Sequence, residues 1–194
     1  MDKNSNNDFL FNRSFQKENY ASLASYLMQG QKDSGIFTCL KHFPGYVGIP
    51  FNPEEELAYL DQVPDISHFH KLAVGRPEMI MVSNVVYKEI DQNLPFSFSQ
   101  KGIEFLKREI PGDFLVISDD LAQNSLLEKF SLREIVSMPI EAGVNILIFS
   151  GWQNPVPQGF NTLVGMARQG EVDKEKIENS FNKILELKSC LVND

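Results

Sequence analysis

In residues 114–121, FLVISDDL, an uninterrupted apolar run is followed by one serine and then by two acidic residues. Short apolar runs of this kind recur along the chain, and a longer segment with helical spacing separates each run from the next. Near-continuous runs of Ile, Leu, Val and Phe are typical of strands in a parallel sheet. The predicted strands are residues 35–41 (GIFTCLK), 79–83 (MIMVS), 114–118 (FLVIS) and 145–150 (NILIFS).

The segments between these runs carry signals for helix boundaries. Ser14, Ser99 and Asp173 are residue types that commonly cap helix N-termini. The alternation of strands and helices predicts an α/β chain built from right-handed βα repeats. Apolar residues at spacings of three and four share one face in the first predicted helix (Tyr20, Leu23, Ala24, Leu27) and in the last (Ile177, Phe181, Ile184, Leu185).

The length and charge of the chain limit its class. It has 194 residues, the usual length of one domain, and a formal net charge of −8, which disfavours nucleic acids and anionic lipid surfaces as partners. Cys39 and Cys190 form no disulfide framework or zinc motif, which favours the reducing cytoplasm. No run approaches the roughly 18 apolar residues of a membrane span, and no signal peptide pattern opens the chain. We therefore expect one soluble, cytoplasmic domain over residues 1–194, with no metal or cofactor.

Polar residues stand at the carboxyl ends of all four predicted strands. In βα folds this end of the sheet is where ligands bind, so the recurrence predicts a common cleft. The loop at residues 44–53, PGYVGIPFNP, follows the first strand and is the densest cluster of Gly and Pro. The polar residues are Lys41 and His42, Ser83 and Asn84, Asp119 and Asp120, and Ser150.

Two adjacent carboxylates follow the strand at residues 114–118. Asp119 and Asp120 repel each other unless they point apart or share a cation. Because Asp is a common N-cap, we expect Asp120 to cap a helix that starts near Leu121, which leaves Asp119 for chemistry. The acid pair by itself also permits a phosphotransferase that binds a divalent metal through both residues.

One motif is more specific than these patterns. Residues 41–45 read KHFPG, and they stand in order with RSF at 13–15, MIMVSNVVY at 79–87 and VISDDL at 116–121. Over about residues 4–150, these segments resemble glycoside hydrolase family 3, specifically its bacterial β-N-acetylhexosaminidase branch. The resemblance implies a (β/α)8 TIM-type barrel. It also implies a retaining glycosidase that hydrolyses O-glycosyl bonds of saccharides containing N-acetylglucosamine.

The same resemblance implies roles for four residues. Asp119 matches the catalytic nucleophile of the family, whose carboxylate attacks the anomeric carbon. Arg13, Lys41 and His42 match positions that bind the sugar, and their donors suit hydroxyl or acyl oxygens. Without the motif, His42 would be interpreted as a core histidine and Arg13 as part of a surface ion pair.

The chain departs from the family in the loop after KHFPG. The family continues KHFPGHG and then an Asp-Ser-His loop whose histidine is the acid/base, whereas residues 45–50 are GYVGIP and no Asp-Ser-His follows. The expected proton donor is therefore missing. His68 and His70 could replace it, but their helical context predicts a surface pair. Asn84 stands where the family often has histidine.

The chain also departs from the family in its number of strands. A complete barrel takes roughly 250 residues, and four strands make about half of one. The Arg-Ser-Phe signature lies mid-barrel in the family but begins here at residue 13, so we expect a partial barrel, roughly its C-terminal half, truncated at its start. Unpaired edge strands favour self-association or a complementing chain. Besides the phosphotransferase, two hypotheses stay open: a β-N-acetylhexosaminidase-like enzyme acting on a small saccharide, and an impaired remnant or non-catalytic sugar-binding module.

Overall fold

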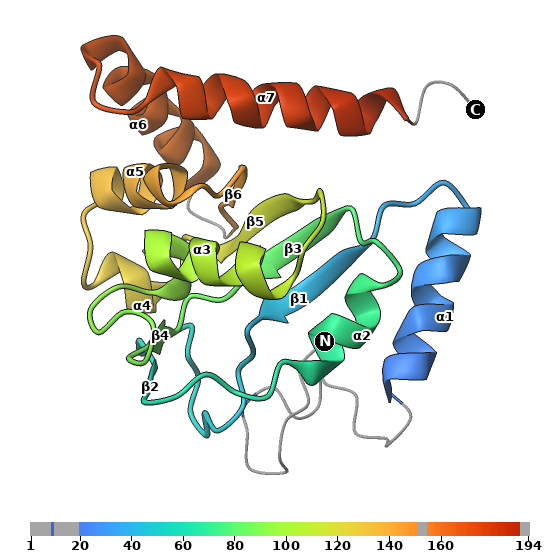
Figure 1. The fold of residues 1–194 in the computed structure, drawn as a ribbon. Helices are drawn as coiled ribbons and strands as arrows, with labels where there is room; N and C mark the ends of the chain where they lie inside the picture. Colours follow the sequence, from blue (N-terminus) through green and yellow to red (C-terminus); the bar gives the residue numbers. More distant parts are fainter. Residues whose placement is uncertain (1–8, 10–19, 151–154, 191–194) are drawn as a thin grey trace.

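The computed structural model describes residues 9, 20–150 and 155–190. Figure 1 shows the arrangement of the helices and strands. In chain order they are α1 (Tyr20–Asp33), β1 (Cys39–Phe43), β2 (Tyr59–Leu60), α2 (Ser67–Ala73), β3 (Met79–Val82), β4 (Val86–Tyr87), the 3-10 helix η2 (Phe96–Phe98), α3 (Gln100–Glu109), β5 (Leu115–Asp120), α4 (Asn124–Leu127), α5 (Leu132–Ala142), β6 (Ile146–Ile148), α6 (Pro155–Gln169) and α7 (Lys174–Ser189).

Four of the strands form one parallel sheet in the order β1-β3-β5-β6. Strands β3, β5 and β6 fall where the apolar runs predict them, so the parallel α/β interpretation is confirmed. Strands β2 and β4 form a separate two-stranded parallel sheet. Each of these two strands has only two residues. They are too short to produce a periodic signal in the sequence.

The first strand of the sheet begins later than predicted. The sequence places it at residues 35–41, whereas β1 spans Cys39–Phe43. The amide of Gly35 donates to the carbonyl of Lys32 at 2.9 Å, and the amide of Ile36 donates to the carbonyl of Gln31 at 2.8 Å. Gly35 has a φ of +68°, the left-handed conformation that commonly ends a helix. Residues 35 and 36 therefore close α1 instead of opening the strand.

Two of the four predicted helix caps are confirmed, and a third lies outside the described residues. The side chain of Ser99 accepts a hydrogen bond from the amide of Gly102 at 3.2 Å, which caps α3. The carboxylate of Asp173 accepts from the amide of Glu175 at 2.9 Å and caps α7. Ser14 is not among the described residues.

The predicted apolar faces of the first and last helices are only partly buried. In α1, Ala24 is buried, but Leu23 and Leu27 are 38% and 48% exposed. In α7, none of the described side chains is buried, and Phe181 is 57% exposed. Helical spacing therefore identified both helices, but it did not identify which apolar side chains are covered.

One face of the large sheet carries the main core. The side chains of Leu40, Ile80 and Val116 are at most 4% exposed and belong to one hydrophobic cluster, together with residues of α2 and α3. Figure 1 places α1 beside the β1 end of the sheet and α5 and α6 near its β6 end. Within the described residues, no helix has the length and apolarity needed to cross a bilayer.

Candidate active site

The carboxyl ends of β1 and β5 bring together two residues that the sequence analysis selected. Because both strands belong to one parallel sheet, their last residues lie at the same edge. The Oδ2 atom of Asp119 is 3.9 Å from the Nε2 atom of His42, and the two side chains are 17% and 9% exposed. Asp119 therefore faces the His42 side chain instead of the outer surface.

Tyr46 completes this group and makes its closest contact. Its hydroxyl donates to Oδ2 of Asp119 at 2.5 Å and accepts from the amide of Asn84 at 3.3 Å. The other carboxylate oxygen, Oδ1, accepts from the amide of Asp120 at 2.8 Å. The tyrosine ring meets the ring of His42 edge-on, with 5.0 Å between the ring centroids. Both oxygens of Asp119 thus have fixed hydrogen-bond donors.

Burial and charge keep Tyr46 protonated. The tyrosine is only 4% exposed, and its burial raises the pKa of the phenol well above its ordinary value. The neighbouring Asp119 carboxylate raises the pKa further by its charge and by accepting the hydroxyl proton. The hydroxyl is consequently a donor throughout the neutral pH range. In the sequence, Tyr46 is visible only as part of a departure from the family motif and is not among the predicted site residues.

The prediction that Asp120 caps a helix near Leu121 is wrong. Strand β5 continues through Asp120, and α4 begins only at Asn124. The carboxylate of Asp120 accepts from the amide of Ala122 at 3.0 Å, and from the amide and hydroxyl of Ser150 at 2.9 and 2.5 Å. Asp120 therefore fixes the end of β6 to the end of β5.

Asn84 also has a structural role next to Asp119 and Tyr46, because its side chain forms several hydrogen bonds. Its side-chain amide donates to the carbonyl of Asp120 at 2.8 Å and to Gln123 at 3.2 Å, and its Oδ1 atom accepts from Ser97 at 2.6 Å. The residue is 3% exposed. Its side chain joins the end of β3 to the segment after β5, and its backbone amide contacts Tyr46.

Ser83 and Tyr87 anchor the loop that carries Tyr46. The hydroxyl of Tyr87 donates to the carbonyl of Gly45 at 2.5 Å, and it lies 3.0 Å from the hydroxyl of Ser83. Both hydroxyl-bearing side chains are fully or almost fully buried. The polar residues at the strand ends therefore divide into two groups. Asp119 and His42 face each other. The others form hydrogen bonds that connect the surrounding segments, and they are Ser83, Asn84, Asp120 and Ser150.

Of the two other predicted sugar-binding residues, Lys41 is described by the structure and Arg13 is not. Lys41 is exposed on β1, next to the buried His42. The Lys41–His42 and Phe43–Pro44 peptide bonds are both cis. Arg13 lies outside the described residues.

The prediction that His68 and His70 form a surface pair is wrong for one of them. His68 is 3% exposed, and its ring packs against Tyr20 and Phe69 with centroid distances of 5.7 and 4.4 Å. His70 is exposed, with its Nε2 atom 3.7 Å from a carboxylate oxygen of Glu109. The two positions lie on different faces of α2 because residues two apart on a helix point in different directions.

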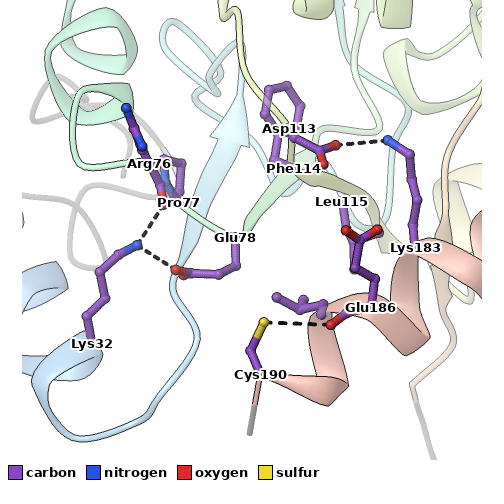
Figure 2. Close-up of a pocket in the computed structure, with 11 residues that line it drawn as sticks. Lys32, Arg76, Pro77, Glu78, Asp113, Phe114, Leu115, Lys183, Glu186 and Cys190 are labelled. Carbon is purple, nitrogen blue, oxygen red and sulfur yellow. Dashed lines mark hydrogen bonds and ion pairs between the residues drawn. The ribbon is translucent and has the colours of Figure 1, made fainter. Parts of the chain in front are cut away.

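A separate cavity of about 330 Å³ lies at the amino ends of the strands, away from Asp119. Figure 2 shows two pairs of oppositely charged side chains around it, Lys32 with Glu78 and Lys183 with Asp113. Lys32 donates to Glu78 at 2.5 Å and to the carbonyl of Arg76 at 2.7 Å, and Lys183 lies 3.0 Å from Asp113. These pairs connect α1 to the start of β3 and α7 to the start of β5. The charged side chains around the cavity therefore have a structural role.

Replacement of Glu78 by glutamine is expected to lower the unfolding free energy by about 1 kcal/mol near neutral pH. Burial tends to raise the pKa of Glu78, but Lys32 and the amide and hydroxyl of Thr38 outweigh it and hold the pKa below its ordinary value. This stabilisation is present above pH 4.5 and is lost as the pH falls through the folded-state pKa. Urea unfolding at a series of pH values measures it.

The Glu78→Gln protein should therefore lose less stability than the wild type on acidification. Glu128→Gln is the matched control because Glu128 is exposed at the end of α4. Parallel stability curves for the wild type and Glu78→Gln would show that the ion pair contributes nothing.

Comparison with known proteins identifies relatives of this chain. The model of the glycosyl hydrolase family 3 N terminal domain matches residues 1–187. A beta-hexosaminidase from Neisseria meningitidis serogroup C is 30% identical over 146 residues, which cover 71% of this chain and 40% of that protein. Beta-hexosaminidase LpqI from Mycobacterium tuberculosis is 26% identical over 175 residues, which cover 82% of this chain and 44% of that protein.

Solved structures agree with the sequence matches. The beta-N-acetylglucosaminidase from Thermotoga maritima superimposes with a TM-score of 0.74 at 30% identity, covering 89% of this chain and 38% of that chain. CbsA from Thermotoga neapolitana superimposes with a TM-score of 0.80 at 27% identity, covering 88% of this chain and 41% of that chain. The chain thus spans less than half the length of these relatives. The predicted partial (β/α)8 TIM-type barrel is confirmed.

Proposed function

Because the chain belongs to the family of glycosyl hydrolase family 3 N-terminal domains, we propose that it is a glycoside hydrolase of the β-N-acetylhexosaminidase type. Its substrate would be a small saccharide containing N-acetylglucosamine, whose O-glycosyl bond is hydrolysed with retention of configuration. One observation carries this proposal. A carboxylate at the end of a barrel strand, Asp119, lies within 3.9 Å of the histidine of the KHFPG motif.

The chemistry requires two displacements at the anomeric carbon. In the first, a carboxylate oxygen of Asp119 bonds to that carbon as the bond to the leaving oxygen breaks. In the second, water bonds to the carbon, the ester bond to Asp119 breaks, and a proton is released to solvent. His42 and Lys41 are suitable donors to the sugar hydroxyl and acyl oxygens, and Arg13 would join them.

The leaving group decides how the proposal is tested. Residues 45–50 provide no Asp-Ser-His acid, so an alkoxide leaving group would depart without a positioned proton donor. A p-nitrophenolate leaves as the anion and needs none. We therefore expect turnover of p-nitrophenyl N-acetyl-β-D-glucosaminide, with much slower turnover of the corresponding alkyl glycoside. A wild-type protein that releases no p-nitrophenolate above the buffer rate would refute the proposed enzyme.

A second candidate is a sugar-binding module without catalysis. It is favoured by residues 45–50, GYVGIP, which provide no acid/base group in the loop after KHFPG. This candidate predicts heat of binding for N-acetylglucosamine in titration calorimetry and no release of p-nitrophenolate. Turnover that depends on Asp119 would eliminate it.

We also propose a domain extent, a cellular compartment and an association state for this chain. We treat residues 1–194 as a single catalytic unit and place it in the cytoplasm, where Cys39 and Cys190 would stay reduced. Because the described residues form a four-stranded parallel sheet, part of a barrel, we also propose that the chain self-associates or binds a complementing chain.

Replacement of Tyr46 by phenylalanine is expected to lower kcat/KM by about tenfold, because one oxygen of Asp119 loses its fixed donor. A second readout is stability at alkaline pH. The raised pKa means that the folded protein keeps the Tyr46 proton above pH 10, whereas the unfolded chain loses it there. Unfolding free energy therefore falls as the pH rises above 10, and Tyr46→Phe should remove this part of the fall.

Tyr59→Phe is the control, because Tyr59 is 45% exposed. Rates and alkaline stability curves that are identical for wild type and Tyr46→Phe would contradict a positioning role for Tyr46.

A further inference from the structure

Strand β5 has one extra residue in the segment that contains Asp119. In the pairing with β6, β5 advances three residues, from Ile117 to Asp120. Over the same length β6 advances two residues, from Ile146 to Ile148. A β-bulge of this kind bends the strand and changes the direction of a side chain, and bulges are common next to active sites. The pairing of β5 with β3 contains no shift, so the irregularity is confined to the side of β5 that faces β6.

The other strand of the site has the same irregularity. In the pairing with β3, β1 advances three residues, from Leu40 to Phe43, while β3 advances two. The extra residue lies in the segment that contains Lys41 and His42. The sheet thus departs from regular pairing at the two strand ends that bring Asp119 and His42 together. Because a bulge leaves a residue out of the backbone ladder, other contacts must fix the direction of its side chain.

Two side chains of β5 attach this bulge to β6 and its end, one before Asp119 and one after it. The hydroxyl of Ser118, which is completely buried, accepts from the amide of Ile148 at 2.9 Å. The carboxylate of Asp120 accepts from the amide and the hydroxyl of Ser150 at 2.9 and 2.5 Å. Both sequence neighbours of Asp119 are therefore held in place through their side chains.

The fixed backbone determines where the Asp119 carboxylate points. The amide of Asp120 donates to Oδ1 of Asp119 at 2.8 Å, so the peptide group between the two residues selects the side-chain rotamer. In that rotamer, Oδ2 accepts the hydroxyl of Tyr46 at 2.5 Å and lies 3.9 Å from His42. The Asp120 carboxylate also accepts from the amide of Ala122 at 3.0 Å, which fixes the chain beyond this peptide. A shift of the peptide would move the Asp119 carboxylate away from Tyr46 and His42.

We propose that Ser118 and Asp120 are positioning residues for Asp119, which they aim toward Tyr46 and His42. They act through the bulged backbone of β5 and not through contact with the sugar. Their effect on catalysis rests on the proposed function, because a reacting group displaced by about 1 Å can lose about 100-fold in rate. Their effect on the contact between Asp119 and Tyr46 can be measured without a substrate.

Asp120→Ala removes every hydrogen bond that this carboxylate accepts and is expected to lower kcat for p-nitrophenyl N-acetyl-β-D-glucosaminide by about 100-fold. KM should change by less than about threefold, because the contacts with the sugar stay in place. Asp120→Asn should keep kcat within about fivefold of wild type, since the asparagine oxygen can accept from the same two amides and its NH2 group can donate to the Ser150 hydroxyl. Equal losses in the two variants would show that the charge of Asp120 matters and would overturn the proposal.

Asp91→Ala is the matched control, because the Asp91 carboxylate also accepts from two amides and one hydroxyl, those of Asn93, Leu94 and Ser99. None of these bonds reaches β6 or Asp119. Asp91→Ala should therefore lose stability in the same way as Asp120→Ala, while kcat and KM stay within about twofold of wild type. An equal fall in kcat for the two variants would show that general destabilisation is the cause, which would contradict a positioning role.

Ser118→Ala tests the attachment on the other side of Asp119. It leaves the amide of Ile148 without the Ser118 hydroxyl and should lower kcat by about tenfold. Ser125→Ala is its control, because the Ser125 hydroxyl is also buried but has no hydrogen-bond partner within the described part of the chain. Unchanged kcat in Ser118→Ala would remove Ser118 from the proposal.

The contact between Asp119 and Tyr46 gives a readout that needs no turnover. In protein labelled with ¹³C at the tyrosine Cζ atom, Tyr46→Phe identifies the NMR signal of Tyr46. Burial raises the pKa of Tyr46, and the neighbouring Asp119 carboxylate raises it further. In Asp120→Ala the carboxylate turns away, so the Tyr46 signal should titrate at a lower pH than in wild type. In Asp91→Ala it should titrate at the same pH as in wild type.

The two readouts separate the positioning role from the hydrolysis. A Tyr46 signal that titrates at the same pH in wild type and Asp120→Ala would overturn the proposal, whatever the rates are. A lower titration pH in Asp120→Ala, in a protein whose wild type releases no p-nitrophenolate, would refute the hydrolysis and support the positioning of Asp119.

Discussion

Replacement of Asp119 by asparagine is expected to lower kcat/KM for p-nitrophenyl N-acetyl-β-D-glucosaminide by on the order of 10³-fold or more. An amide oxygen is a weak nucleophile, so the covalent bond to the anomeric carbon no longer forms at a useful rate. The fold should survive, because asparagine has nearly the same volume and keeps an oxygen that can accept the Tyr46 hydroxyl. Initial rates over a range of substrate concentrations measure the effect.

Azide gives this experiment a chemical readout. In Asp119→Ala, the removed carboxylate leaves space in which azide can bond to the anomeric carbon as p-nitrophenolate leaves. The expected product is the α-glycosyl azide, and its configuration identifies the face from which Asp119 attacks. Asp113→Asn is the control, since Asp113 pairs with Lys183 at the other end of the sheet. Equal kcat/KM for wild type and Asp119→Asn would disprove the assignment of the nucleophile.

The second large effect concerns stability. Phe43→Ala is expected to lower the unfolding free energy by about 3–5 kcal/mol, a large part of the total of about 5–15 kcal/mol of an ordinary domain. Phe43 is completely buried, and its ring lies 5.0 Å from that of Phe69, 5.6 Å from that of Phe96 and 6.1 Å from that of Phe105. Alanine would leave a cavity among three rings that cannot close around it.

Urea unfolding at one fixed protein concentration measures this loss, since association would add to apparent stability. Phe43→Leu fills most of the space and should cost about 1.5 kcal/mol. Leu127→Ala, at a site that is 48% exposed, should change stability by no more than about 0.5 kcal/mol. Similar losses for Phe43→Ala and Leu127→Ala would contradict the central place of Phe43 in the core.

The central strands of the fold could be predicted because their signals are local. Strands β3 and β5 are continuous apolar runs, and Ser99 and Asp173 cap their helices through their own side chains. The start of β1 could not be predicted in this way. An apolar run there includes Ile36, which is 53% exposed because the turn that ends α1 directs it outward.

The faces of the helices could not be predicted from spacing alone. An apolar stripe shows which side chains can be buried, but the neighbours decide which of them are. Leu23 and Leu27 of α1 lie beside the buried Ala24, yet both remain exposed. The same limit applies to His68, whose burial depends on Tyr20 and Phe69.

The site was only half predictable. The resemblance identified Asp119 and His42, and the structure brings them within 3.9 Å of each other. Tyr46 was missed because no local pattern shows that a loop residue 73 positions away meets Asp119. Its one sequence signal was that a phenol stands directly after KHFPG, where the family has histidine. Asp120 was misassigned because its partner, Ser150, is 30 residues away.

The hydrogen bond from Tyr87 to the Gly45 carbonyl bears on how a ligand would be received. A loop that is tethered through a buried phenol has already lost its conformational freedom when the chain folds. An incoming sugar would therefore meet a preorganised wall, and its affinity would carry no entropic penalty for ordering this segment. Binding of a sugar against this loop would therefore require no induced fit.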